Sequence, residues 1–182
     1  MKNIDFINKY GITLRRLTHD KIELVRYWRT NPKISQFLVY RGEITPEQQE
    51  KWFQKINNSN TDFYFIIEIG EKEIGLINIK DIDYNEKCGE PGIFIWDDEY
   101  LNSDIPIKAM LALYDFCIES LNISKFIVHV LSDNKRAIRF NKGFGYKISD
   151  NQEDVYNQEY TLLKDEYITY REKIRKIYLK AL

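Results

Sequence analysis

The 182-residue sequence has only two cysteines and two histidines, and it has no long apolar run. Cys88 and Cys117 lie far apart and do not form the disulfide framework of a small secreted domain. His19 and His129 lack the neighbouring cysteines of a zinc site, so we expect no metal. No apolar stretch approaches the roughly 20 residues of a membrane-spanning helix. Residues 1–6 lack an apolar signal core, and we therefore expect a reduced, cytoplasmic protein with no membrane partner.

The sequence also lacks an excess of positive charge. Its 27 Lys and Arg are balanced by 28 Asp and Glu, which gives a formal net charge of −1. Proteins that bind nucleic acid neutralise phosphates with Lys and Arg, so this balance argues against a nucleic-acid partner. Apolar residues are abundant at 43%, with 13 Tyr, 10 Phe and 3 Trp, which is ample for one core. We expect a single domain over residues 1–182.

The order of the expected elements indicates an α+β fold, in which a mostly antiparallel sheet packs with helices. Apolar patterns typical of strands lie at 12–17, 63–69, 72–80, 90–96, 125–131 and 157–163. Helical patterns follow the first strand as far as Asn31, start again at Thr45-Pro46, and recur at about 105–121. A charged helix is expected from about residue 165 to the end of the sequence.

Most of the functional information lies in residues 92–146. A strand at 92–96 is followed by an acidic turn at 97–104, the long helix and the strand at 125–131. In such a unit, the turn before the helix is a place where anions bind, because the first N–H groups of a helix have no partner within it.

The segment Asn134-x-x-Ala137-Ile-Arg-Phe-Asn-Lys-x-Phe-Gly145-Tyr146 resembles a pattern of the GCN5-related N-acetyltransferases, the GNAT family. The resemblance covers residues 12 to about 163. It implies a twisted sheet with a V-shaped splay between the fourth and fifth strands, 90–96 and 125–131. It also implies acetyl-CoA as co-substrate and a small-molecule primary amine as acceptor.

A narrower resemblance concerns the acceptor. Tyr27-Trp28-Arg29-Thr-Asn-Pro32, residues 41–45 and Trp52-Phe53 look like the subgroup near the ribosomal-protein acetyltransferases. They look more closely like enzymes that acetylate a nucleotide-linked amino sugar, as in pseudaminic-acid biosynthesis. This implies that Trp28 stacks on the nucleotide base and that Arg29 and Arg41 hold the diphosphate. The alternatives are an acceptor that is a protein N-terminus, a Trp28 that belongs to the core, and an Arg29 that forms a salt bridge.

The resemblance also implies the residues that bind the cofactor. They belong to the fourth strand, the start of the long helix and the following helix: Phe94, Ile95, Trp96, Asn102, Ser103, Ile105, Lys108, Asn134, Ala137, Arg139 and Phe140. The glycine-rich phosphate loop of the family falls on 102–104 here, and both key glycines are missing. Asp104 could cap the helix in place of a phosphate, and Pro106 removes one N–H donor. A non-catalytic binding domain is therefore a further alternative.

The catalytic residues are predicted from the same comparison. Glu90, at the entry to the fourth strand, is the expected general base, and Tyr100 is the second choice. Where many GNAT enzymes place a tyrosine as general acid, this sequence has Asn141, which has no proton to give near neutral pH. We interpret His129, within an apolar strand, as a core histidine. The basic C-terminal helix is expected to be a solvated face, with a homodimer contact as the alternative.

Overall fold

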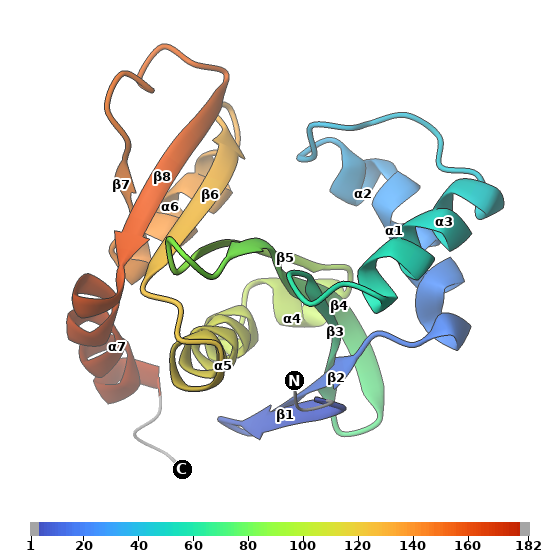
Figure 1. Ribbon diagram of the computed structural model, residues 1–182, viewed down its shortest axis with the longest axis horizontal. Coiled ribbons are helices and arrows are strands. Elements are labelled where there is room, and N and C mark those ends of the chain that lie inside the picture. The colour runs from blue at the N-terminus through green and yellow to red at the C-terminus, as the bar shows by residue number, and fades with distance from the viewer. Residues whose placement is uncertain (1–3, 179–182) are drawn as a thin grey trace.

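The computed structural model describes residues 4–178 and contains an eight-stranded sheet with helices packed on both faces (Figure 1). The strand order is β1-β2-β3-β4-β5-β6-β8-β7. The strands are β1 (Phe6–Lys9), β2 (Ile12–Arg16), β3 (Phe63–Ile69), β4 (Lys72–Asp83), β5 (Cys88–Ile95), β6 (Lys125–Leu131), β7 (Lys147–Ile148) and β8 (Asn157–Leu163).

The sheet opens between β5 and β6. Every other pair of neighbouring strands is antiparallel, whereas β5 and β6 are parallel and pair only at Cys88 with Lys125 and at Gly89 with Phe126. From Glu90 onward β5 leaves β6, and Figure 1 shows β6 and β8 leaning away from the β1–β5 half. The predicted V-shaped splay and the α+β fold are confirmed.

Local signals fix where the main helices begin and end. The α-helices are α1 (Ile22–Thr30), α2 (Pro32–Ser35), α3 (Pro46–Asn57), α4 (Asp98–Leu101), α5 (Ile105–Ser120), α6 (Lys135–Phe144) and α7 (Lys164–Tyr178), and a 3₁₀ turn covers His19–Lys21. Thr45 and Gln48 form a capping box at the start of α3. Asn134 caps α6, which ends at Gly145 in a left-handed conformation that glycine adopts easily.

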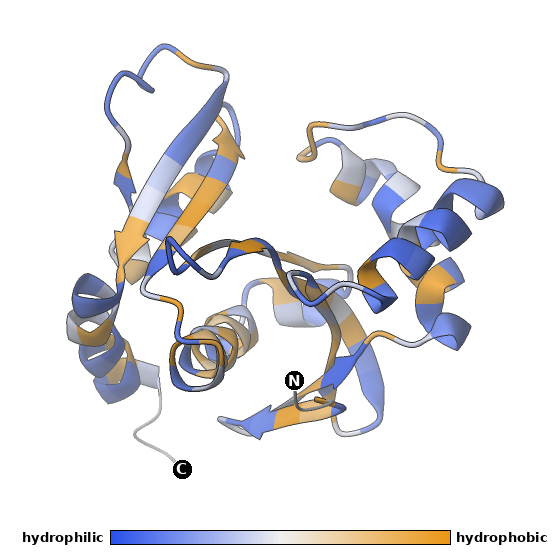
Figure 2. Cartoon of the chain, viewed as in Figure 1, coloured by the Kyte–Doolittle hydropathy of each residue, from blue (hydrophilic) through white to orange (hydrophobic). Residues whose placement is uncertain are grey.

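Two apolar clusters hold the helices on opposite faces of the sheet. On one face α5, α6 and α7 cover the larger cluster, and on the other α1 and α3 cover a smaller one that includes Val25, Phe53, Leu76 and Trp96. Helix α5 is buried over most of its surface, since ten of its residues are buried, and Figure 2 shows its apolar colouring. The unit of strand, helix and strand therefore has a rigid centre.

Two short strands lie outside the six strand segments named from the sequence. β1 pairs with β2 at the sheet edge, and β7 pairs with β8, where a polar segment was expected. Both are short, and neither has a continuous apolar pattern. Residues 179–182 of the predicted C-terminal helix lie outside the described residues. Within residues 4–178, no helix combines the length and apolarity that crossing a membrane requires.

Candidate active site

A row of charged side chains crosses the sheet where β5 and β6 part. The strand register places Lys80 opposite Glu90 and His129 opposite Glu159. Lys80 Nζ lies 2.9 Å from Glu90 Oε2, Glu90 Oε1 lies 3.6 Å from His129 Nδ1, and His129 Nε2 lies 3.8 Å from Glu159 Oε2. We call these four residues the polar row. It bridges four strands at the vertex of the splay.

The interpretation of His129 as a core residue was wrong. Phe126, Val128 and Val130 are buried in the large cluster, and in a strand the residues between them point to the opposite face. His129 is therefore exposed on the side of the splay, with 38% of its side chain accessible. The alternation of 126, 128 and 130 was visible in the sequence and could have predicted this.

The two carboxylate oxygens of Glu90 have different partners in the polar row. Burial alone would lower the pKa of Lys80, but hydrogen bonds to Asp81 and Glu90 outweigh burial and raise it, so Lys80 stays cationic. Glu90 therefore has one oxygen bound to a permanent cation, while its other oxygen faces His129 across a gap longer than a hydrogen bond. That second oxygen can accept a proton.

The edge of β5 that faces the splay offers backbone groups. The Trp96 N–H donates to Ile74 O of β4, and Lys33 Nζ donates to Trp96 O at 2.6 Å. Because bonding alternates along an antiparallel strand, Phe94 also faces β4, whereas Ile93 and Ile95 face β6. Because β5 pairs with β6 only at Cys88 and Gly89, β6 supplies no ladder partner for these two amides within residues 4–178. Of the strand residues predicted to bind the cofactor, Ile95 has backbone groups that face the splay. Ile93, which was not predicted, has them as well.

The start of α5 lacks the features of a phosphate-binding loop, as the sequence suggested. The role of Asp104 there differs from the predicted one. Asp104 does not cap the helix; its carboxylate pairs with Lys108 Nζ at 2.8 Å. The Ile105 N–H donates to Ser103 Oγ at 3.1 Å, and Pro106 has no N–H. The first turn of α5 therefore offers few free donors, and Lys108 is already neutralised.

The start of α6 lies against the same loop. The Ala137 N–H donates to Asn134 Oδ1 at 3.0 Å, so this side-chain oxygen serves as a helix cap. Arg136 donates to Leu101 O and, at 2.9 Å, to Asn102 Oδ1. The loop before α5 and the first turn of α6 are thus joined across the open end of the splay.

The remaining predicted residues of α6 differ in their surroundings. Arg139 is exposed, and Phe140 packs against Phe144 with ring centroids 5.3 Å apart. Asn141 is buried on the helix face that it shares with Ala137 and Phe144, and its side-chain amide has no hydrogen bond within residues 4–178. Its amide is not one of the fully buried polar groups that lack a partner, so it reaches water, which a bound group can replace.

Tyr100, the second choice for the catalytic base, does not lie beside Glu90. Tyr100 is on α4, beyond the far end of β5, and Lys72 Nζ lies 5.0 Å from its ring centroid. Along β5, Glu90 and Ile95 are already about 16 Å apart, and Tyr100 lies further along the chain. Tyr114 and Tyr146 are buried and hydrogen-bonded to each other at 2.9 Å, and burial is the main reason that the pKa of each is raised. The structure does not bring Tyr100 to the polar row.

The predicted acceptor residues lie on or after α1. Trp28 stacks on Trp96 with centroids 5.9 Å apart and an angle of 3° between the planes. Arg29 is half-buried over the Trp52 ring at 5.7 Å, and burial lowers its pKa. Within residues 4–178 it has no salt bridge, which excludes the salt-bridge interpretation there.

Arg41 lies apart from Arg29, on the loop between α2 and α3. Its Nη2 donates to the Tyr156 hydroxyl at 3.1 Å, and that hydroxyl donates to Asp133 Oδ2 at 3.0 Å. The loop therefore reaches across to the β6–β8 half of the sheet. Arg41 is exposed, and these contacts are to groups that water also reaches.

Comparison with known proteins gives the same picture as the geometry. The family model described as "Acetyltransferase (GNAT) domain" matches residues 12–147. Acetyltransferase PseH of Campylobacter jejuni is 25% identical over 141 residues, covering 78% of this chain and 86% of that protein. Spermidine N(1)-acetyltransferase of Vibrio cholerae is 22% identical, covering 74% of this chain and 78% of that protein.

Solved structures agree on the fold. The spermidine N-acetyltransferase from Vibrio cholerae in complex with CoA and spermine superimposes with a TM-score of 0.76 at 20% identity, covering 87% of this chain and 98% of that chain. A putative acetyltransferase from T. thermophilus gives a TM-score of 0.74 at 16% identity, covering 97% of this chain and 98% of that chain.

An open wedge between two parallel strands, next to the starts of two helices, defines a class of CoA-dependent acyltransferases. The family model spans well over half of the sequence, and the chain belongs to the GNAT acetyltransferase family. It is an acetyl-CoA-dependent N-acetyltransferase, so the alternative of a non-catalytic scaffold is set aside.

The residues present fit acetyl-CoA unevenly. At the splay, the backbone of Ile93 and Ile95 and the unpartnered Asn141 amide suit its amide-containing arm. At α5, the Asp104 carboxylate and Pro106 make a weak phosphate site, although Lys135 and Arg139 are nearby cations in α6. When bound, acetyl-CoA supplies the thioester; alignment of its arm along β5 and acceptance of the amine proton at the polar row stay predictions for this chain.

Proposed function

We propose that the acceptor is the primary amine of an amino sugar linked to a nucleotide. The observation that supports this most is the Arg29 guanidinium, which lies half-buried over Trp52 without an anionic partner within residues 4–178. A half-buried cation without a counterion is costly, and a phosphate group would match its planar pair of donors. A diphosphate on the substrate would supply that anion.

The position of Arg29 relative to the polar row suits such a substrate. Burial raises the pKa of Tyr64 to about 12, and the charges acting on it include those of Lys80 and Arg29. Tyr64 therefore lies near both residues. A substrate with its phosphate at Arg29 would have Lys80 and Glu90 within reach of its sugar end.

The relatives support this choice without deciding it. Acetyltransferase PseH proteins are similar over most of the chain, and so is a spermidine acetyltransferase. A polyamine carries only positive charge, so an unpaired Arg29 would repel it, whereas a diphosphate would be attracted. A protein N-terminus is the third candidate, and nothing about Arg29 favours it.

The test measures release of the CoA thiol from acetyl-CoA with three acceptors: a UDP-linked amino sugar, spermidine and an N-terminal peptide. We expect the highest kcat/KM for the UDP-linked sugar. Arg29→Gln should raise the KM for that sugar by about 10- to 100-fold, because a charge-assisted pair of hydrogen bonds is lost. The KM for acetyl-CoA should not change.

Arg26→Gln is the matched control, because Arg26 lies on the same helix but is paired with Glu23 at 2.7 Å. It should leave the KM for the sugar unchanged. Preferential acetylation of spermidine or of the peptide, or equal effects of the two arginine variants, would contradict the proposed acceptor.

We also propose that the protein associates with copies of itself. A similar Vibrio cholerae spermidine acetyltransferase is described as dodecameric. On this chain Tyr27 of α1 and Phe37, Val39 and Tyr40 of the loop after α2 are large exposed side chains. Sedimentation of the wild type and of a Val39→Asp variant tests this: we expect dissociation in the variant, and a monomeric wild type would refute the proposal.

A further inference from the structure

Acetylation of an amine releases a proton, and the polar row has the shape of a path for it. At neutral pH the acceptor arrives as an ammonium group. The C–N bond forms and the C–S bond breaks, with the sulfur keeping the bonding electron pair. Of the two protons that the nitrogen loses, one ends on sulfur and the other must reach solvent.

Glu90 alone is a poor end point for that proton. Its Oε2 is bound to Lys80 at 2.9 Å, and only 25% of its side chain is accessible, so a proton on Glu90 needs a further path to solvent. It can accept the proton only in passing. Its free Oε1 faces His129 Nδ1 at 3.6 Å.

We propose that His129 relays the amine proton from Glu90 to Glu159 and thence to solvent. Nδ1 takes the proton from Glu90 Oε1 while the Nε2 proton passes to Glu159 Oε2, and a ring flip or a second exchange through water resets the imidazole. Imidazole is the side chain best suited to gaining and losing protons near neutral pH. The inference needs only the amine-acetylating activity and does not depend on which amine is the acceptor.

The geometry favours a relay over a static salt bridge. Both gaps, 3.6 and 3.8 Å, exceed a hydrogen bond, so His129 is not locked to either carboxylate. His129 and Glu159 have 38% and 36% of their side chains accessible, so a small rotation or one bridging water closes each gap. Glu90, at 25%, is less exposed than either His129 or Glu159, so both lie closer to solvent than the first proton acceptor.

The charged and titratable groups around the relay come from several elements. Glu90 faces His129 from β5 and Glu159 faces it from β8, while Lys80 and Asp81 of β4 stand behind Glu90. The negative charge of Glu90 is also one of the smaller causes that raise the pKa of the buried Tyr146, so that phenol stays protonated and does not compete.

The main test compares His129→Gln with His19→Gln across pH. His19 is the matched control, because it is also exposed and paired with a glutamate, Glu50, at 2.8 Å. With a UDP-linked amino sugar or spermidine as the amine, whichever is turned over, His129→Gln should lower kcat about 100-fold near pH 7. The loss should shrink toward pH 9, where the amine arrives already neutral.

Two further readouts separate a relay from a structural role. Acetyl-CoA affinity measured by calorimetry should be unchanged in His129→Gln, and added imidazole should restore part of the rate of His129→Ala. A loss that is constant with pH and is not rescued, or no loss at all, would overturn the proposal.

A readout without turnover keeps the inference independent of the acceptor. In ¹⁵N-histidine-labelled protein, Glu90→Gln should move the Nδ1 resonance of His129, and Glu159→Gln its Nε2 resonance, with His19 unaffected. If neither variant moves the His129 resonances, the relay is refuted. If they move but the UDP-linked sugar is not acetylated, only the proposed acceptor fails.

Discussion

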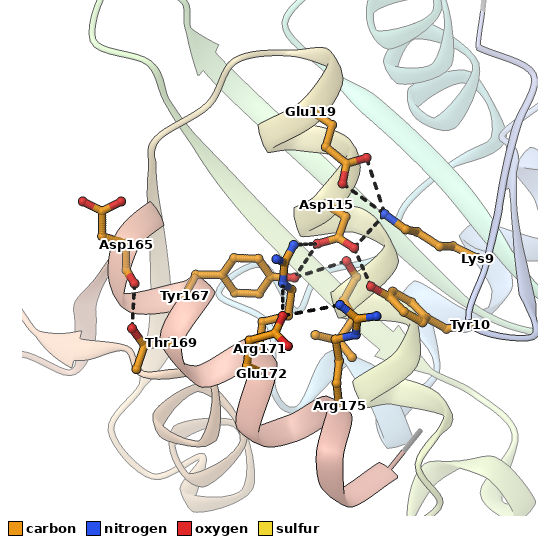
Figure 3. A network of polar contacts seen from close by, with 11 residues as sticks. Lys9, Tyr10, Asp115, Glu119, Asp165, Tyr167, Thr169, Arg171, Glu172 and Arg175 are labelled. Atoms are coloured by element: carbon orange, nitrogen blue, oxygen red, sulfur yellow. Dashed lines mark hydrogen bonds and ion pairs between the residues drawn. The ribbon is translucent and has the colours of Figure 1, made fainter. Parts of the chain in front are cut away.

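Two carboxylates of this enzyme, Asp115 and Glu90, are both held by cations, yet their surroundings differ. Asp115 on α5 is 1% exposed and accepts from the Tyr10 and Tyr167 hydroxyls and from Arg171, and it pairs with Lys9 at 2.7 Å (Figure 3). Glu90 is 25% exposed, and only one of its oxygens has a bound partner within residues 4–178.

The difference indicates that Asp115 has a structural role and that Glu90 is suited to a chemical one. Both oxygens of Asp115 are occupied, and its partners come from β1, the turn after it and α7, so it holds both ends of the chain against α5 (Figure 3). Glu90 keeps one oxygen free beside an open strand edge, where a substrate can approach. A carboxylate whose two oxygens are both bound stabilises the fold. A carboxylate with one unbound oxygen at the splay can accept and pass on a proton.

The largest expected effect comes from removing Asp115, the carboxylate whose two oxygens are both bound. Asp115→Ala removes the buried acceptor that Lys9, Arg171 and two tyrosine hydroxyls share, and leaves the two cations only their exposed partners Glu119 and Glu172, so the free energy of unfolding should fall by about 3–5 kcal/mol. Urea unfolding measures this. Glu119→Gln, at the exposed second partner of Lys9, should cost less than about 0.5 kcal/mol, and equal losses would contradict the assignment.

Glu90→Gln should lower activity strongly and change stability little. We expect kcat to fall about 100-fold because the first proton acceptor is lost. The unfolding free energy should change by less than about 1 kcal/mol, because Lys80 keeps Asp81 as a partner at 2.9 Å. Full activity, or a loss of stability as large as that of Asp115→Ala, would remove the contrast between the two carboxylates.

A third carboxylate, Asp104, lies between these extremes. It pairs with Lys108 at the start of α5, where the family binds phosphate. Asp104→Asn removes a negative charge and frees Lys108, so acetyl-CoA should bind about three- to tenfold more tightly. Calorimetry measures this, with Glu99→Gln on the preceding turn as control. Unchanged affinity would mean that the phosphates bind elsewhere.

The smallest expected effect is the pH dependence of stability at Asp115. Burial alone would raise the pKa of this carboxyl, but hydrogen bonds from Lys9, Tyr10 and Arg171 outweigh burial and hold it below its ordinary value. Its contribution is therefore complete above about pH 4 and is lost as pH falls through the lowered folded value. Thermal unfolding from pH 6 to 3 should show this decline in the wild type, and a decline of the same size in Asp115→Asn would contradict it.

The sequence predicted those parts of the fold that depend on local signals. The start of α3 follows from Thr45-Pro46 and the long helix from its apolar content, and both were confirmed. The splay between the strands at 90–96 and 125–131 came from the family resemblance and was confirmed by a pairing that stops at Gly89. The strand β1 was missed because four half-exposed residues give no pattern.

Much of the candidate site depends on contacts between distant segments, which the sequence does not display. Glu90 lies beside the splay, where it was expected as a strand-entry carboxylate, although its catalytic role stays a prediction. Its partners Lys80 and His129 are brought to it by the register of β4 and by the end of pairing with β6. The pairing of Asp104 with Lys108, one helical turn apart, was readable from the spacing but was not predicted.

The central claim is that the edge of β5 facing the splay receives acetyl-CoA, and amide hydrogen exchange tests it most directly. The Ile93 and Ile95 amides should exchange markedly more slowly once acetyl-CoA is added. The Trp96 amide, which already donates to Ile74, should not change. Exchange at Ile93 and Ile95 that is unaffected by saturating acetyl-CoA would contradict the account.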